Sequence, residues 1–326
     1  MRGTAAAVLL LTLALSGCGN GAPAEPAPST TASSPSPSPS PSTVPPGTPP
    51  PSTGPSSPST PSLESPPLPP MTSLTVPVLP TPQDRGIVEG ADVSWPQCPA
   101  GMGIPQKRSH GAPMPLDSAE FVILGLTNGP AFYPNPCLAE QVAWVRKRRL
   151  MAAAYSVLSY PEPRHLRQYG GQGPYDADTR LGRLGNVGYQ QALFNLDTMR
   201  RAGLPSPVVW LDVESVPDFD WPRDDPEGNA AVVRGAERGY SEAGLLVGVY
   251  STQHLWRGVV GDLRLGLPEW RAAGQTSRAE ALRRCGPERM IQGGAAILAQ
   301  WVELDRDRNV TCPGESAYLG LWFHQY

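Results

Sequence analysis

Short apolar runs alternate with helical patterns between residues 121 and 250, and this alternation restricts the fold more than any other feature of the chain. The runs are Phe121–Leu126, Met151–Leu158, Val208–Glu214 and Leu245–Tyr250, and each has the length of a buried strand. Alternating strands and helices in a chain of this length predict an α/β fold with a parallel sheet. The order of elements alone leaves an open sheet and a closed barrel as alternatives.

Three helices are expected between these strands. Each is recognised by apolar residues that recur on one face, and a glycine follows the last two. The first has Asn135 as its N-cap and Pro136 at its first position. The faces are Leu138, Val142 and Val145 in the first helix, Tyr189, Leu193 and Leu196 in the second, which stops at Gly203, and Val232, Ala236 and Tyr240 in the third, which ends at Gly244.

The run Val208–Glu214 favours the closed barrel. Side chains of a strand alternate between two faces. One face holds Val209, Leu211 and Val213, and the other holds Val208, Trp210, Asp212 and Glu214. The second face changes from apolar to acidic toward its C-terminal end, as in a barrel with a packed interior and reactive groups at one end. In an open sheet, helices would cover both faces, and burying two carboxylates there would be costly. We therefore expect a TIM-type (β/α) barrel, in which some strands or helices can depart from the regular pattern.

Asp212 and Glu214 form a candidate acid pair. At positions i and i+2 of a strand, their backbones lie about 6.6 Å apart and their carboxyl groups are free to converge. Like charges at this distance raise the proton affinity of one group. One carboxyl then stays protonated while the other is ionised, which is what cleavage of a glycosidic bond requires. The alternative is an ordinary pair of surface charges, but the apolar strand before the pair favours a site.

The N-terminal part of the chain predicts export. Residues 1–18 have one cation, Arg2, and an apolar run too short to span a membrane. The end of this segment, Leu15–Cys18, resembles the bacterial lipobox, which implies that Cys18 becomes a lipid-modified N-terminus. An ordinary cleaved signal is the alternative. Residues 19–83 are dominated by Pro, Ser and Thr and bury too little apolar surface to fold, so we expect a disordered tether or a modified stalk.

Residues 84–326 form the predicted folded domain. It holds 25 Lys and Arg against 27 Asp and Glu, a net charge of 25 − 27 = −2, so no basic surplus favours nucleic acid. The chain has no HExxH, no GxSxG and no glycine-rich phosphate loop. We expect no cofactor and no metal.

Cys98, Cys137, Cys285 and Cys312 remain after Cys18, and an even number in an exported domain predicts two disulfides. Three pairings are possible. The shortest loops come from pairing Cys98 with Cys137 and Cys285 with Cys312. A zinc site is the alternative, but no two cysteines have CxxC spacing and the histidines form no close pair.

Several segments, in order along the chain, resemble the glycoside hydrolase family 25 muramidases, lysozyme-type enzymes of (β/α)-barrel fold that cut peptidoglycan. Residues 90–97, GADVSWPQ, are similar to the family's opening strand, and residues 121–129 with 133–136 are similar to its second strand and the following loop. Residues 210–214, WLDVE, resemble its catalytic fourth strand and residues 248–252 its fifth. Residues 299–301 and 307–309 resemble its closing elements.

The resemblance implies roles for individual residues. Glu214 would be the general acid, and Asp212 would stabilise positive charge or hold the substrate's 2-acetamido group. Asp92 and Asp307 would support them at the same end of the barrel, unless they are a turn residue and a loop charge. Aromatic side chains that would stack on sugar rings, unless they belong to the core, are Trp95, Tyr155, Tyr250 and Trp301.

The chain also departs from the family pattern. Gly125 and Asn128 stand where the family has a lysine and a glutamate, and residues 155–157 differ from its Tyr-His-Phe. The segment Pro161–Gly185 has no counterpart. Three hypotheses therefore remain: a glycoside hydrolase, a glycan-binding module that no longer cuts, and a scaffold lipoprotein. In each we expect an exported monomer in the cell envelope, anchored to the outer face of the membrane through Cys18, with a cell-wall polysaccharide as the partner of the first two.

Overall fold

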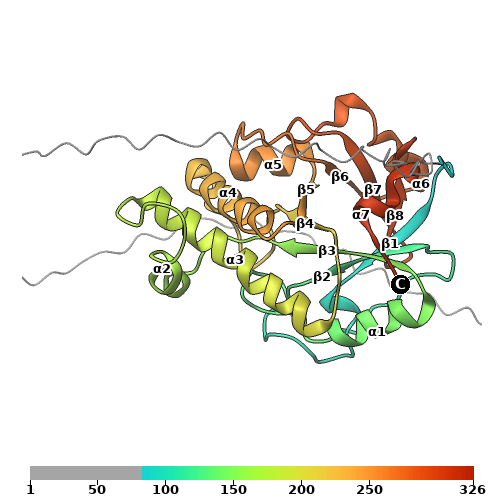
Figure 1. Cartoon of the computed structure of the whole chain (residues 1–326), viewed down its shortest axis with the longest axis horizontal. Coiled ribbons are helices and arrows are strands. Elements are labelled where there is room, and N and C mark those ends of the chain that lie inside the picture. Colours follow the sequence, from blue (N-terminus) through green and yellow to red (C-terminus); the bar gives the residue numbers. More distant parts are fainter. Residues whose placement is uncertain (1–82) are drawn as a thin grey trace, which may run out of the picture. The chain divides into compact units, whose positions relative to one another are not determined.

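The computed structural model describes residues 83–326, so the predicted signal, the tether and Cys18 lie outside the described residues. Strands β1 to β8 follow one another around a barrel that the β2–β3 pairing closes, which confirms the predicted (β/α) barrel (Figure 1). The strands are β1 (Glu89–Val93), β2 (Phe121–Gly125), β3 (Met151–Val157), β4 (Val208–Asp212), β5 (Leu246–Ser251), β6 (Glu269–Gln275), β7 (Ala296–Glu303) and β8 (Arg306–Thr311).

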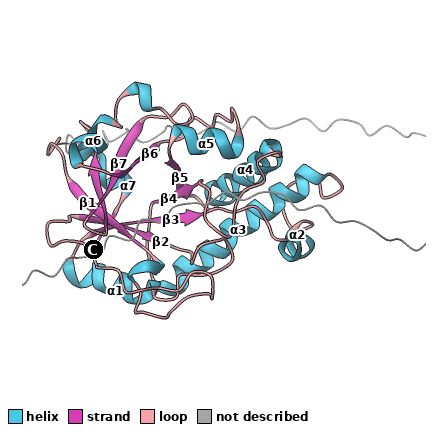
Figure 2. Ribbon diagram, turned by 180° about the vertical axis from the view of Figure 1, so that it is seen from behind, coloured by secondary structure: helices cyan, strands magenta, loops and turns pink. Residues whose placement is uncertain are grey.

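Helices cover the outside of this barrel (Figure 2). They are α1 (Leu138–Arg148), α2 (Pro163–Tyr169), α3 (Arg180–Ala202), α4 (Pro226–Glu242), α5 (Gln253–Val260) and α6 (Arg278–Arg283), whereas the short α7 (Leu319–Trp322) packs against the apolar cluster inside the barrel. The long helices α3 and α4 lie side by side in both views. Glycines make their close contact possible, since a Cβ on Gly188 would lie 1.9 Å from the carbonyl oxygen of Val232. The unmatched segment Pro161–Gly185 forms α2 and the first turn of α3.

Strand β8 departs from the expected parallel sheet. It runs antiparallel to both neighbours, β7 and β1. Its first residues therefore lie at the end of the barrel where the parallel strands finish. The C-terminal strand β9 (His324–Gln325) pairs only with the start of β3, so β8 and not the tail closes the barrel.

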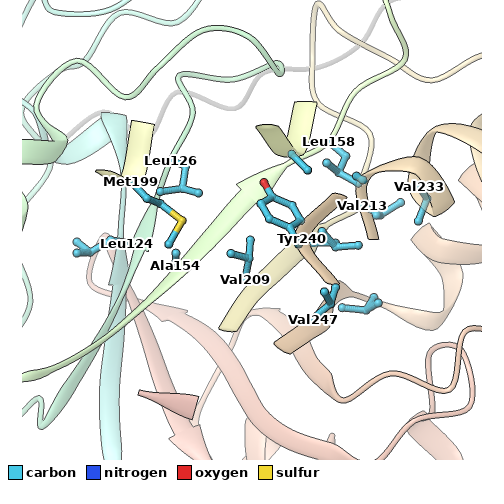
Figure 3. Packing of buried hydrophobic residues seen from close by; sticks show 14 of the residues in the cluster. Leu124, Leu126, Ala154, Leu158, Met199, Val209, Val213, Val233, Tyr240 and Val247 are labelled. Atoms are coloured by element: carbon cyan, nitrogen blue, oxygen red, sulfur yellow. The ribbon is translucent and has the colours of Figure 1, made fainter. Parts of the chain in front are cut away.

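The predicted two faces of the fourth strand are confirmed. Val208 and Trp210 are fully buried in the apolar cluster inside the barrel. Val209, Leu211 and Val213 belong to a second cluster beneath the helices, where Figure 3 shows Val209 and Val213 near Tyr240 of α4. One boundary was wrong, because β4 ends at Asp212 and Glu214 lies in a bend.

Large aromatic side chains fill the barrel interior next to inward-facing glycines. Phe121 pairs with Gly90 on the neighbouring strand, and Trp210 pairs with Gly248. A Cβ on either glycine would lie 2.3 Å from ring atoms of its partner, so only glycine leaves room for the ring. These pairs let five-residue strands enclose a densely packed core.

The helices agree with the predictions in type but not in every detail. Helix α4 buries Val232, Ala236 and Tyr240 as predicted, and α1 buries Leu138, Val142 and Val145. However, α1 begins at Leu138, and the Asn135 side chain instead accepts from the Cys137 amide in the preceding turn.

Helix α3 buries a different face from the one predicted. Leu193 is 38% exposed, whereas Gln191 and Asn195 are fully buried. Gln191 donates to the carbonyl oxygen of Ser159 at 2.9 Å, and Asn195 donates to the Ser156 hydroxyl at 2.8 Å. These hydrogen bonds satisfy the N–H groups of both buried amides, although the Asn195 Oδ1 has no partner among the described residues, and the polar side chains are thus tolerated where an apolar pattern was expected.

Both predicted disulfides are present. Cys98 is bonded to Cys137 and Cys285 to Cys312, with Cα–Cα distances of 5.6 Å in each pair. The first joins the segment after β1 to the start of α1, and the second joins the end of α6 to the end of β8. The pairing with the shortest loops is therefore the one that the fold uses.

Candidate active site

An open cleft lies at the end of the barrel where the parallel strands finish. Its volume is about 240 Å³, close to the lower limit of roughly 300 Å³ that is usual for small-molecule sites. All four carboxylates predicted from the sequence line it. The lining residues are Asp92, Ser94, Trp95, Pro96, Lys107, Gly129, Tyr155, Val157, Asp212, Glu214, Val216, Tyr250, Trp270, Gln300 and Asp307.

Three separate stretches of chain bring these carboxylates together. Asp92 is on β1, Asp212 is the last residue of β4, and Glu214 follows in the bend. The indole of Trp221 donates to the carbonyl oxygen of Glu214 at 3.1 Å and so fixes that bend. Asp307 reaches the same cleft because β8 is antiparallel and begins at this end. A fully parallel eighth strand would have placed its first residues at the opposite end.

Asp92 is held by a hydrogen-bond network inside the barrel. Its Oδ1 accepts from the side-chain amides of Gln300 at 3.0 Å and Asn309 at 2.7 Å. Each amide is oriented in turn, because Tyr250 donates to Gln300 at 2.7 Å and Trp270 donates to Asn309 at 2.7 Å. Burial and then the charge of Asp307 raise the pKa of Asp92, against these two donors. The network fixes the position of this carboxyl group.

Asp212 is buried without comparable support. Its side chain is 4% exposed, and among residues 83–326 its Oδ1 has no hydrogen-bond partner. Burial raises the pKa of Asp212 well above its usual value, and the charges of Glu214 and Asp92 raise it further. This oxygen is therefore available to a donor or a positive charge that enters the cleft.

Glu214 and Asp307 are more accessible, and the charge of Asp307 acts on Glu214. Burial raises the pKa of Glu214, and the charge of Asp307 adds to this effect. Burial raises the pKa of Asp307 to about 6. Because the four groups share one poorly solvated site, they bind protons as a coupled set. At mildly acidic pH this set holds protonated and ionised carboxyls side by side, which is the arrangement for acid and base chemistry.

Three of the four predicted aromatic residues line the cleft, namely Trp95, Tyr155 and Tyr250. Trp301 does not, and the prediction that it binds substrate is wrong. It is fully buried on the outer side of the barrel wall against Ala281 of α6, with the Arg308 guanidinium over its ring. Successive residues of a strand face opposite sides, so Gln300 is the residue of this pair that faces the cleft.

Sequence reasoning missed four lining residues that carry polar or aromatic groups: Ser94, Lys107, Trp270 and Gln300. Gln300 was within a recognised motif but next to the residue that was chosen. Trp270 is on β6, which no apolar run had marked as a strand. Lys107 is in the connection between β1 and β2, where no periodic pattern predicts the direction of a side chain.

Two of the departures from the family pattern, Gly125 and Asn128, have local explanations. A Cβ on Gly125 would lie 2.4 Å from the Ser94 Cβ and 2.8 Å from the Tyr155 ring, so no larger residue fits. Asn128 is 1% exposed and does not line the cleft. Its side chain instead binds the backbone of the turn at residues 104–107.

Across residues 83–326, no three His, Cys, Asp or Glu side chains form a group that could hold a metal ion. No helix in this part of the chain combines the length and the apolar character needed to cross a membrane.

No protein-family model and no curated protein matches the sequence. Among solved structures, the chain is similar to a family GH25 lysozyme from Aspergillus fumigatus, with 15% identity and a TM-score of 0.44 over 72% of this chain and 99% of that one. It is similar to the bacterial lysozyme from Streptomyces coelicolor, with 15% identity and a TM-score of 0.44 over 73% and 98%. The spore cortex lytic enzyme SleM of Clostridium perfringens gives 14% identity and a TM-score of 0.44 over 70% and 69%. The first of these belongs to the family that the sequence motifs resemble.

Proposed function

We propose that this protein is an extracytoplasmic glycoside hydrolase that cleaves peptidoglycan or a related cell-wall glycan by carboxylate acid/base chemistry. The observation that carries the proposal is the convergence of Asp92, Asp212, Glu214 and Asp307 on one open cleft. Aromatic rings of Trp95, Tyr155 and Tyr250 line the same cleft and offer faces for sugar rings. The resemblance of the motifs to family 25 muramidases supports the same substrate class.

Glu214 is the general acid in this proposal. It is the more accessible member of the pair at the end of β4, and burial together with the charge of Asp307 raises its pKa, which favours the protonated form that a general acid needs. It gives this proton to the glycosidic oxygen as the bond to the leaving sugar breaks.

Asp212 is the partner that stabilises positive charge. Its buried Oδ1 has no hydrogen-bond partner among the described residues, so it is free to face charge that develops on the sugar ring. The same oxygen suits the N–H of a 2-acetamido group, as the family resemblance implies. Asp92, which is fixed by Gln300 and Asn309, and Asp307 act as supporting charges.

The test compares Glu214→Gln with the unmodified protein in release of reducing ends from purified peptidoglycan. Loss of general acid catalysis should lower the rate about 10²–10⁴-fold. Glu140→Gln, an exposed position on α1, is the matched control and should leave the rate unchanged. Equal rates for Glu214→Gln and the unmodified protein would remove Glu214 from the reaction.

The glycan-binding alternative predicts a different pair of results. Neither Gly125 nor Asn128 places a polar group in the cleft, so fewer polar groups are available for catalysis than the family pattern implies. This observation favours a protein that binds glycan without cutting it. A protein that sediments with insoluble peptidoglycan but releases no reducing ends is a binding module. A protein that neither binds nor cuts is a scaffold.

We also propose that the mature protein is anchored to the outer face of the membrane by a lipid on Cys18. The lipobox-like segment Leu15–Cys18 supports this proposal, and two disulfides are typical of an oxidising compartment outside the cytoplasm. Cys18→Ala should abolish incorporation of labelled fatty acid and release the protein from membranes. Unchanged labelling would show that Cys18 is not the site of attachment.

A further inference from the structure

The turn at residues 104–107 is fixed to the barrel by one buried side chain. The Oδ1 of Asn128 accepts from the Ile104 amide at 2.6 Å, and its Nδ2 donates to the carbonyl oxygen of Lys107 at 3.0 Å. The turn also closes on itself, since the Lys107 amide donates to the Ile104 carbonyl at 2.9 Å. Because Asn128 is 1% exposed, this attachment is rigid and places the backbone of Lys107 beside the cleft.

The side chain of Lys107 runs over Gly129 toward the cleft. A Cβ on Gly129 would lie 3.0 Å from Cγ of Lys107 and 3.7 Å from its Cδ and Cε, so the aliphatic stem covers this glycine. Gly129 has a φ of +80°, which disfavours a side chain there on backbone grounds as well. Lys107 is the one cationic residue among those that line the cleft.

Lys107 forms no ion pair within the described part of the protein. Every ion pair among residues 83–326 has arginine as its cation. Lys107 therefore lines an acidic cleft without forming an ion pair with any of the four carboxylates.

We propose that Lys107 is a specificity-determining residue that binds a carboxylate substituent of the glycan. The inference rests on the proposed function and specifies its substrate as an acidic glycan. Four carboxylates in one cleft repel an anionic ligand, so an acidic sugar binds well only with its charge near the single cation. Lys107 thus selects acidic over neutral glycans and sets the direction in which the chain lies in the cleft.

A binding measurement tests this selection. Glu214→Gln, which the proposed function predicts to bind without turnover, is compared with and without a second change, Lys107→Met, on two ligands. These are solubilised wall glycan fragments and the same fragments after carbodiimide-mediated amidation of their carboxyl groups. Lys107→Met should weaken binding of the untreated fragments about tenfold, as expected for one charge-assisted contact, and leave binding of the amidated fragments unchanged.

The chain provides a matched control, because Lys107 and Lys147 are its only lysines. Lys147 is exposed on α1, so Lys147→Met removes the same charge away from the cleft and should change neither affinity. Equal weakening of both ligands by Lys107→Met would overturn the proposal, as would equal effects of the two lysine substitutions. Failure of the Glu214→Gln protein to bind either ligand would also overturn it.

The scarcity of lysine gives a second, direct readout. Reductive methylation with ¹³C-formaldehyde keeps the charge of both lysines and labels them with methyl groups that NMR resolves. The signal that Lys107→Arg removes should move when untreated fragments are added and stay in place with amidated fragments. Movement of the Lys147 signal alone would contradict the assignment.

These experiments separate the inference from the proposed function. Binding and NMR shifts do not require cleavage. If the unmodified protein releases no reducing ends but Lys107→Met still lowers affinity for the acidic fragments, the hydrolase proposal fails and the role of Lys107 stands. If cleavage occurs and Lys107→Met changes the affinities for untreated and amidated fragments equally, the hydrolase proposal stands and the role of Lys107 fails.

Discussion

The two halves of the barrel interior use the same strands for opposite purposes. In one half, Phe121, Ile123, Val208 and Trp210 are fully buried and belong to the apolar cluster inside the barrel. In the other half, one step further along the same β4 strand, Asp212 begins a group of four carboxylates. The packing of the apolar half thus stabilises the fold. The acidic half holds carboxylates that destabilise the fold and that the proposed reaction requires.

The pKa values of the four carboxyl groups show this destabilising effect. Burial raises the pKa of all four carboxyls, which means that their charged forms are disfavoured by the fold. Such groups persist where they are needed for function, and removing them commonly stabilises the protein. Substitutions in the two halves should therefore change stability in opposite directions.

The largest effect is expected in the apolar half, at the Trp210–Gly248 pair. Trp210→Ala removes a fully buried ring and should lower the free energy of unfolding by about 3–5 kcal/mol. Gly248→Ala forces a Cβ to within 2.3 Å of the same ring and should cost about 1–3 kcal/mol. Chemical denaturation followed by circular dichroism measures both.

Gly258→Ala is the matched control for the glycine substitution. Gly258 lies in α5, and an added Cβ would meet no atom within 4 Å. Because alanine is the better helix former, stability should stay the same or rise by up to about 1 kcal/mol. A loss at Gly258 as large as that at Gly248 would refute the explanation based on packing inside the barrel.

A smaller effect of opposite sign is expected in the acidic half. Asp212→Asn removes a buried charge whose Oδ1 has no partner among the described residues, and it should raise the free energy of unfolding at neutral pH by about 1–3 kcal/mol. The same protein should lose activity on peptidoglycan. A variant that is both less stable and fully active would contradict the division between the two halves.

The dependence of the unfolding free energy on pH tests whether charge causes the stabilisation by Asp212→Asn. The pKa of Asp212 is higher in the folded than in the unfolded chain, so the folded state binds more protons and its stability falls as pH rises. For Asp307 the corresponding fall lies between about 4 and about 6, the value to which its pKa is raised. The advantage of Asp212→Asn should therefore grow as pH rises from 4 to 7 and vanish below the unfolded pKa. An advantage independent of pH would mean that charge is not its cause.

Much of the barrel could be predicted because its cause is local. The alternation along Val208–Asp212 predicts which side chains face inward, and the structure confirms it. The shortest-loop pairing of Cys98 with Cys137 and of Cys285 with Cys312 is also the one observed. The family resemblance implied that the four carboxylates share one end of the barrel, and three of them, Asp92, Asp212 and Glu214, lie at or just beyond the C-terminal ends of parallel strands.

Other features could not be predicted because they depend on neighbours distant in sequence. Trp301 and Gln300 differ only in which side of β7 they face, and a shift of one residue in strand register exchanges them. Leu193 is exposed on α3 because the barrel supplies hydrogen-bond partners that allow Gln191 and Asn195 to be buried instead.

The sequence by itself determined the strand–helix alternation, the change from apolar to acidic along the fourth strand, and the inventory of charges, because these depend on residue order and on side-chain chemistry. Only the tertiary structure decided that β8 runs antiparallel and brings Asp307 to the cleft. It alone decided that Gln300 and Asn309 hold Asp92, and that Asn128 and Gly129 direct Lys107 to the same place. The physical reason is that hydrogen bonds and steric contacts between distant segments form only when the closed barrel brings those segments within a few ångströms of one another.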